Sequence, residues 1–134
     1  MKYLLDTNIC IYIIKRKPPE VIDRFKSLPP NDVATSAITV AELEYGAYKS
    51  QQVAKNRAAL QKFLLPLEIA DFTAKATAVY GQLRADLAQR GCIIGAMDML
   101  IAAQAIAQDL MLVTNNTDEF CRIAELKLEN WVNQ

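Results

Sequence analysis

Histidine is absent from this chain of 134 residues, and its three cysteines, Cys10, Cys92 and Cys121, are scattered without a CxxC spacing. The lack of histidine argues against mechanisms that depend on a histidine base. With so few sulfur ligands, the sequence also disfavours a zinc site of the Cys/His type and a disulfide framework. We therefore expect the cysteines to be small core residues of a protein in the reduced cytoplasm.

Long apolar runs and an excess of one charge are lacking as well. No stretch approaches the roughly 18 consecutive apolar residues of a transmembrane helix. Asp6 and Asn8 interrupt the apolar start of the chain, which argues against a signal peptide. Fifteen basic and fifteen acidic residues cancel, so net charge alone indicates no nucleic-acid binder. Four acids gathered in one pocket would nevertheless leave the remaining surface positive.

Apolar residues make up 52% of the sequence, which excludes a disordered chain. The length fits one domain over residues 1–134 with a single core. So large an apolar share predicts surface that a second copy or a tight protein partner would cover.

Two predicted strands near the start of the chain are each followed by a carboxylate. Residues 3–5 form a short apolar run that ends at Asp6, and an apolar helix follows, which Thr7 or Asn8 is placed to cap. Residues 33–38 are predicted to form a second strand. The tetrad from Thr39 to Glu42 then matches a capping box at the start of the next helix.

The same order recurs twice in the second half of the chain. Residues 99–107 are almost all apolar and small, which predicts a buried helix with Asp98 in its first turn. Residues 110–113 are predicted to form a strand, and Asp118 and Glu119 open the short helix that follows. Each acid taken alone is adequately explained as a helix-starting residue.

Alternating strands and helices predict a three-layer α/β/α domain around a mainly parallel sheet of four to five strands. Right-handed crossovers bring the carboxyl ends of parallel strands to one edge, so the acids should converge there. Clustered carboxylates repel one another, and a cation would keep them ionised. Because the available ligands are all oxygens, we expect Mg²⁺ or Mn²⁺ rather than Zn²⁺.

Four motifs together make the sequence resemble the PIN-domain ribonucleases, specifically the VapC toxins of bacterial toxin–antitoxin pairs. They are Leu-Leu-Asp-Thr-Asn-Ile at 4–9, Val-Ala-Glu-Leu at 40–43, Ile-Gly-Ala-Met-Asp-Met-Leu-Ile-Ala-Ala at 94–103 and Val-Thr-Asn-Asn-Thr-Asp-Glu-Phe at 113–120. The resemblance covers essentially the whole chain.

The resemblance implies a role for each of the acids. Asp6, Glu42 and Asp98 would be metal ligands and catalytic residues. The fourth acid of the family stands just before an aromatic residue, which here is Glu119, although the adjacent Asp118 leaves a second candidate. Four further residues would orient the ligands or a water molecule: Asn8, Thr114, Asn116 and Asp118.

The resemblance also implies a function and partners. The protein would be a Mg²⁺- or Mn²⁺-dependent endoribonuclease that inhibits translation by cutting structured RNA. Its first candidate substrate is tRNA, at the anticodon stem-loop of the initiator. It would form a homodimer and bind a VapB-type antitoxin in a hetero-oligomer, with no role for a membrane.

Two other functions fit parts of the sequence. A phosphotransfer module, either a receiver-like domain or a phosphatase, would use Asp6 as a covalent acceptor. Phosphatases of the haloacid dehalogenase type carry a second Asp two residues after the acceptor, where this chain has Asn8, and no Lys follows the last sheet strand as a receiver domain requires. A catalytically silent binding module would use the acids only as helix starters. The presence of all four candidate ligands argues against it.

Overall fold

The computed structural model describes residues 1–133. Its elements are β1 (Tyr3–Leu5), α1 (Thr7–Lys15), α2 (Pro19–Lys26), η1 (Pro30–Asp32), β2 (Val33–Ser36), α3 (Ala37–Tyr48), α4 (Val53–Leu64), β3 (Glu68–Ala70), α5 (Ala74–Gln89), α6 (Ala96–Ala107), β4 (Met111–Val113), α7 (Thr117–Phe120) and β5 (Leu128–Glu129). None of the described helices is long and apolar enough to cross a membrane.

The five strands form one parallel sheet in the order β3-β2-β1-β4-β5. Strand β1 lies in the centre, and the chain winds outward from it in both directions. Where the strand order changes direction in this way, between β1 and β4, a crevice forms beyond the carboxyl ends of the strands. Asp6 and Thr114 follow β1 and β4 directly, and the Asp6 N–H donates to the Val113 carbonyl at 3.0 Å. This edge of the sheet is therefore where the functional side chains are expected.

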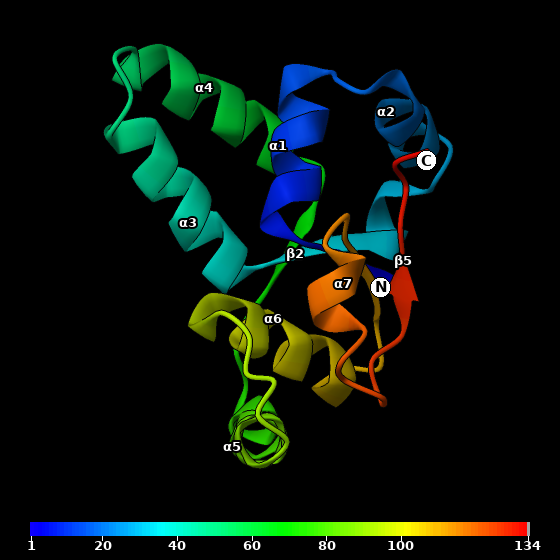
Figure 1. Cartoon of the computed structure of the whole chain (residues 1–134). Coiled ribbons are helices and arrows are strands. Elements are labelled where there is room, and N and C mark those ends of the chain that lie inside the picture. Colours follow the sequence, from blue (N-terminus) through cyan, green and yellow to red (C-terminus); the bar gives the residue numbers. More distant parts are fainter. Residues whose placement is uncertain (134) are drawn as a thin grey trace.

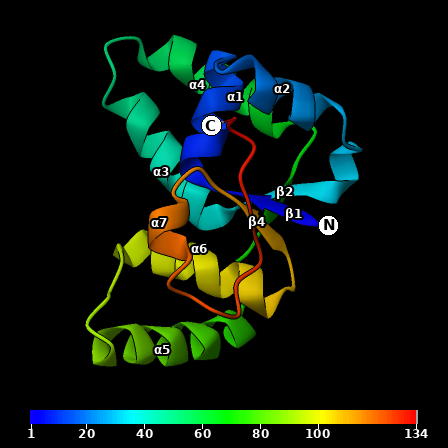
Figure 2. The same ribbon diagram turned by 45° about the vertical axis from the view of Figure 1, so that its right-hand side comes forward.

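Successive residues of each strand serve two different cores. Leu4 packs with α5 and α6 on one face of the sheet, while Leu5 packs with α1, α2 and α4 on the other. Ala34 and Val33 divide in the same way. Side chains alternate between the faces of a strand, so a fully apolar strand requires helices on both sides. Figures 1 and 2 show these helices above and below the sheet, which confirms the predicted three-layer α/β/α architecture and parallel sheet.

Helix α6 is buried as predicted, but it carries one polar side chain in the core. Gln104 is fully buried; its Oε1 accepts from Ser36 Oγ at 2.5 Å, and its Nε2 donates to the carbonyls of Ala70 and Asp71 at 2.7 and 3.0 Å. All of its hydrogen-bonding groups are engaged, as burial of an amide requires. Gln104 thus ties α6 to the ends of β2 and β3.

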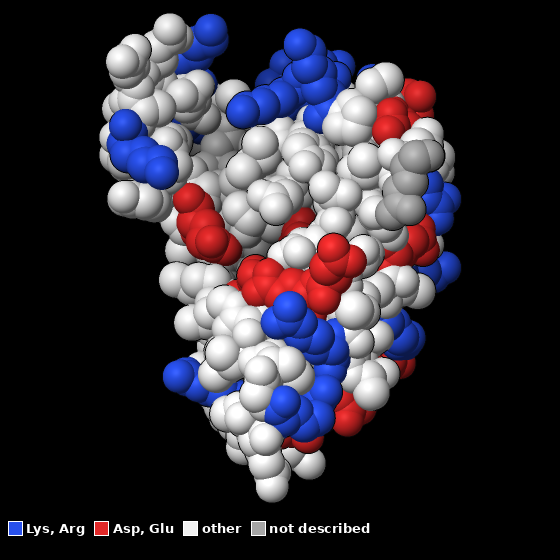
Figure 3. All heavy atoms as spheres, in the orientation of Figure 1, with Lys and Arg blue, Asp and Glu red and all other residues white. Residues whose placement is uncertain are grey.

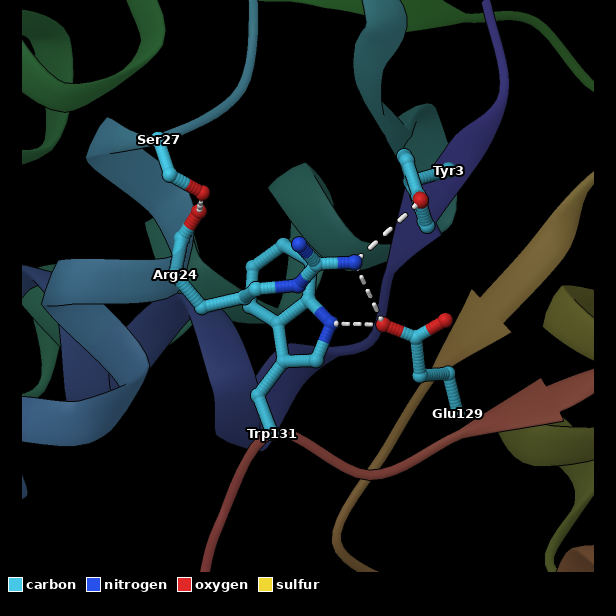
Figure 4. A network of polar contacts seen from close by, with 5 residues as sticks. All are labelled: Tyr3, Arg24, Ser27, Glu129 and Trp131. Carbon is cyan, nitrogen blue, oxygen red and sulfur yellow. Dashed lines mark hydrogen bonds and ion pairs between the residues drawn. The ribbon is translucent and has the colours of Figure 1, made fainter.

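The edge strand β5 is shorter than the predicted strand over residues 126–131, and side-chain contacts hold it in place. Arg24 of α2 donates to Glu129 at 3.1 Å and to the Tyr3 hydroxyl at 3.4 Å (Figure 4). Trp131 donates its Nε1–H to the same Glu129 oxygen at 2.8 Å. The Glu129 carbonyl in turn accepts from the Thr114 N–H at 3.0 Å. This network therefore fixes the residue that follows β4.

Two predicted helix starts are wrong. Asp6, rather than Thr7 or Asn8, caps α1, because its side chain is the one that accepts from the Ile9 N–H. Helix α3 begins at Ala37, since the Ser36 hydroxyl accepts from the Ile38 N–H, and β2 accordingly ends at Ser36. No capping box forms at Glu42, which lies more than a turn inside α3 and is free to contact another helix.

Candidate active site

Asp6 is placed at the carboxyl end of the central strand and is only 5% exposed. Its Oδ1 accepts from the Ile9 N–H at 2.9 Å, and its Oδ2 accepts from Thr114 Oγ1 at 2.5 Å. Burial raises the pKa of this carboxyl to about 6; the two hydrogen bonds act in the opposite direction, and the charge of Glu42 adds to the rise. The side chain is thus held in one orientation, at a cost in free energy when it is ionised.

Glu42 reaches the same region from α3. Its Oε1 accepts from Thr7 Oγ1 at 2.8 Å, and Thr7 also lies 3.5 Å from the Thr39 hydroxyl. Thr7 is therefore a residue of the site, whereas the sequence predicts for it only the role of a helix cap. Its position next to Asp6, on the turn of α1 that faces α3, is a signal that could have identified it.

Asp98 and Glu119 form the other side of the site. Asp98 lies in the first turn of α6, and burial followed by the charge of Glu119 raises its pKa to about 6. Glu119 Oε1 accepts from the Gly95 N–H at 2.8 Å, and this bond is the main reason that the pKa of Glu119 is lowered. A Cβ on Gly95 would stand 3.2 Å from Asp98 Oδ2, so glycine leaves the room that the carboxylate needs.

The structure distinguishes the two adjacent acids of α7. Glu119 contacts Gly95 and also accepts from Asn116 Nδ2, whereas Asp118 is exposed. Asn116 therefore lies where it can orient Glu119, as Thr114 orients Asp6. The Asn8 side chain is exposed, and its backbone N–H is the part that faces Asp6.

The four acids influence one another although they come from four separate elements. The charges of Glu119, Asp6 and Glu42 all raise the pKa of Asp98, and Glu42 raises that of Asp6. Figure 3 shows acidic side chains in the centre of one face and at the foot of the projecting α3–α4 pair, with Lys and Arg around them. The structure thus brings together the strand-end acids of the sequence.

The donor set fits a hard divalent cation. It consists of carboxylate oxygens supported by hydroxyl, amide and backbone groups, which suits Mg²⁺ or Mn²⁺. Among residues 1–133, no three of these carboxylates lie close enough together to hold one cation without a change in their side-chain conformation. Burial is the main cause of the raised pKa values of Asp6 and Asp98, and the charges of the neighbouring acids add to it.

Comparison with known proteins places the chain in a family. The family model of the PIN domain matches residues 3–126. Ribonuclease VapC2 of Rickettsia felis is 50% identical over 132 residues, with 98% of both chains covered. The tRNA(fMet)-specific endonuclease VapC of Shigella flexneri is 43% identical over 131 residues, again with 98% of both chains covered.

A solved structure shares the fold over the same extent. The crystal structure of VapBC2 from Rickettsia felis, bound to a DNA fragment from its promoter, matches with a TM-score of 0.93 and 49% identity and covers 98% of this chain and 100% of that one. The sequence comparison and the fold comparison agree. The chain belongs to the PIN-domain family and, within it, to the VapC ribonucleases.

Proposed function

We propose that this protein is the toxin of a VapBC pair and that it cleaves RNA internally with the help of Mg²⁺ or Mn²⁺. The observation that carries the proposal is the meeting of Asp6, Glu42, Asp98 and Glu119 at one edge of the sheet, where burial and then the neighbouring charges raise the pKa of Asp6 and Asp98. Carboxylates so close together favour a divalent cation, and such a cation suits phosphodiester hydrolysis.

The four acids share two tasks in this mechanism. Asp6 and Asp98 would hold the principal ion, while Glu42 and Glu119 complete the cluster and position a water molecule for in-line attack. An ion held by these residues would activate the attacking water and stabilise the leaving oxygen. Because water is the nucleophile, and not the ribose 2′-hydroxyl, the products carry a 5′-phosphate and a 3′-hydroxyl.

Neighbouring side chains keep these acids in place. Thr114 and the Ile9 N–H each occupy one oxygen of Asp6, so the carboxylate presents its remaining lone pairs in a set direction. Thr7 donates to Glu42, and Asn116 donates to Glu119. Because these donors already hold the carboxylates in place, less free energy is needed to orient the carboxylates around an ion.

The substrate we propose is tRNA, with the anticodon stem-loop of the initiator as the first candidate. Its support is the tRNA(fMet)-specific endonuclease VapC of Shigella flexneri, which is 43% identical. Cleavage there would inhibit translation in the cytoplasm. The partner would be a VapB-type antitoxin whose tail enters the acidic site of a homodimeric toxin. The crystal structure of VapBC2 from Rickettsia felis supports such a pairing.

The test is to incubate antitoxin-free protein with total bacterial RNA and Mg²⁺ or Mn²⁺, beside EDTA and an Asp6→Asn variant, and to sequence the fragment ends. Discrete cuts that need the metal and are absent from the variant would support the proposal and identify the substrate. Fragments ending in 2′,3′-cyclic phosphate would contradict the mechanism. Equal background in every lane would favour the catalytically silent binding module instead.

A further inference from the structure

Two tyrosines on α3 are exposed to solvent although they are large and aromatic. Tyr45 is 66% exposed and Tyr48 is 57% exposed. Each has a cation over its ring: Lys49 Nζ lies 5.0 Å from the centroid of Tyr45, and the Arg57 guanidinium lies 4.9 Å from that of Tyr48. Proteins that bind single-stranded nucleic acids present exposed aromatic rings next to Lys and Arg side chains.

The α3–α4 arm that carries these rings is internally braced. Glu44 accepts from Arg57 at 3.2 and 3.4 Å, which links α3 to α4 and holds the guanidinium beside Tyr48. At the turn, Ser50 Oγ donates to the Ala47 carbonyl at 2.6 Å, and Asn56 donates to the same hydroxyl at 2.9 Å. A surface prepared in this way loses little conformational entropy when it binds a ligand.

Both rings lie further along α3 than Glu42, Tyr45 by about one turn and Tyr48 by nearly two. Lys49 is seven residues after Glu42, so it lies within about 20° of it around α3 and about 10 Å further along the axis. Tyr45 is one turn from Glu42 and lies between the two along the axis. A cavity of about 300 Å³ lies between α1, α3 and α4 and is lined by Thr7, Glu42 and Gly46, while both rings lie outside its lining. Figure 3 shows Lys and Arg side chains on the arm and a hollow between it and the body.

From these contacts we infer that Tyr45 with Lys49, and Tyr48 with Arg57, form a stacking surface for unpaired nucleotides of an RNA substrate whose scissile phosphate lies at the acids. The inference rests on the proposed function. Bases stack on the free faces of the rings, while Lys49 contacts a phosphate and Arg57, held by Glu44, stays beside Tyr48. Four of the fifteen acids belong to the site, so the rest of the surface carries fifteen basic and eleven acidic residues, which favours a polyanion although the chain has no net charge.

The experiment compares two phosphodiesters with Mn²⁺ and the full chain without antitoxin. One is an RNA stem-loop with unpaired loop nucleotides, and the other is bis(p-nitrophenyl) phosphate, which is too small to reach the arm. Tyr45→Ala should lower kcat/KM for the RNA by about fivefold to a hundredfold, the range measured for loss of a stacked base, mainly through KM. Hydrolysis of the small ester should stay within about twofold.

Matched variants separate stacking from general surface effects. Tyr45→Phe keeps the ring and should keep the RNA activity, and Leu65→Ala removes an apolar side chain that is 86% exposed elsewhere on the arm and should also have no effect. Lys49→Gln should reduce the salt dependence of RNA binding by about 0.7 in logarithmic slope. Arg84→Gln removes a comparable cation beside Tyr80 on α5 and should leave the slope unchanged.

Several results would overturn the inference. Unchanged RNA cleavage by Tyr45→Ala would do so, as would an equal loss on both substrates, which would place the effect at Glu42. A fall from dimer to monomer in light scattering would assign the ring to contact between copies. If the wild-type protein hydrolyses neither substrate, the proposed function fails. The stacking surface can then still be tested by the fluorescence anisotropy of labelled RNA. Equal affinity of the wild type and Tyr45→Ala for this RNA would reject the stacking surface.

Discussion

Replacing Gln104 with Met should destabilise the protein strongly, although the two side chains have nearly the same shape. Methionine leaves the Ser36 hydroxyl and the Ala70 carbonyl without their partner in the core, while the Asp71 carbonyl is less deeply buried. An unsatisfied buried group costs about 1 to 3 kcal/mol, and the gain from burying an apolar side chain offsets part of it. We expect a loss of about 2 to 4 kcal/mol in the free energy of unfolding.

Urea denaturation followed by circular dichroism measures this loss as a lower midpoint with an unchanged slope. In a thermal scan, the same change corresponds to a fall of roughly 10 °C in Tm for a chain of this size. Gln108→Met is the matched control, because Gln108 Oε1 is buried and has no hydrogen-bond partner among residues 1–133. That variant should be neutral or slightly stabilising.

A double-mutant cycle with Ser36→Ala tests the connection between α6 and β2. The two changes should be less than additive by about 0.5 to 3 kcal/mol, because either one breaks the same hydrogen bond. If Gln104→Met costs under about 0.5 kcal/mol, the reasoning from hydrogen-bond satisfaction is refuted, since the core would then tolerate unpaired polar groups at this position.

Three further predictions concern the acidic site. Thr114→Val removes the 2.5 Å hydrogen bond to Asp6 and should weaken Mn²⁺ binding about 10- to 100-fold in calorimetric titration; equal affinity would show that this bond does not orient the ligand. Gly95→Ala brings a methyl group to 3.2 Å from Asp98 Oδ2 and should reduce RNA cleavage, whereas Gly46→Ala, which meets nothing within 4 Å inside α3, should raise stability by about 0.5 to 1 kcal/mol; similar behaviour of the two variants in cleavage assays would contradict the steric argument. Because burial raises the folded-state pKa of Asp6 from 3.8 to about 6, the folded state binds the proton more tightly, so the metal-free protein should gain about 1 kcal/mol from this group between pH 7 and pH 5. Chemical denaturation at a series of pH values measures this gain, and Asp6→Asn should abolish that part of it; an unchanged pH dependence in the variant would assign the effect to other groups.

Local sequence determined most of the architecture. The apolar runs at 3–5 and 110–113 are too short for helices and too apolar for an exposed sheet, so they specify strands covered on both faces. Asp6 and Asp98 could be chosen as candidate site residues from the sequence, because a carboxylate that follows a predicted strand or begins a predicted helix can be recognised in the chain itself. The parallel sheet then follows from alternation of strands and helices.

Tertiary structure decided which neighbouring residue takes each task. Ser36 rather than Thr39 caps α3, because β2 ends early enough for its hydroxyl to reach the Ile38 N–H. Of the two adjacent acids on α7, Glu119 faces Gly95 and Asp98, because a helix directs successive side chains about 100° apart.

The partners of buried polar groups were likewise set only by folding. Gln104 reads as an interruption of an apolar helix, yet it bonds to Ser36 and to two backbone carbonyls. Thr7 reads as a helix cap, yet it donates to Glu42, 35 residues away in the chain. Sequence periodicity specifies which side of a helix or strand is buried. The distance between two elements, and hence which polar groups meet, is determined only when the layers pack together.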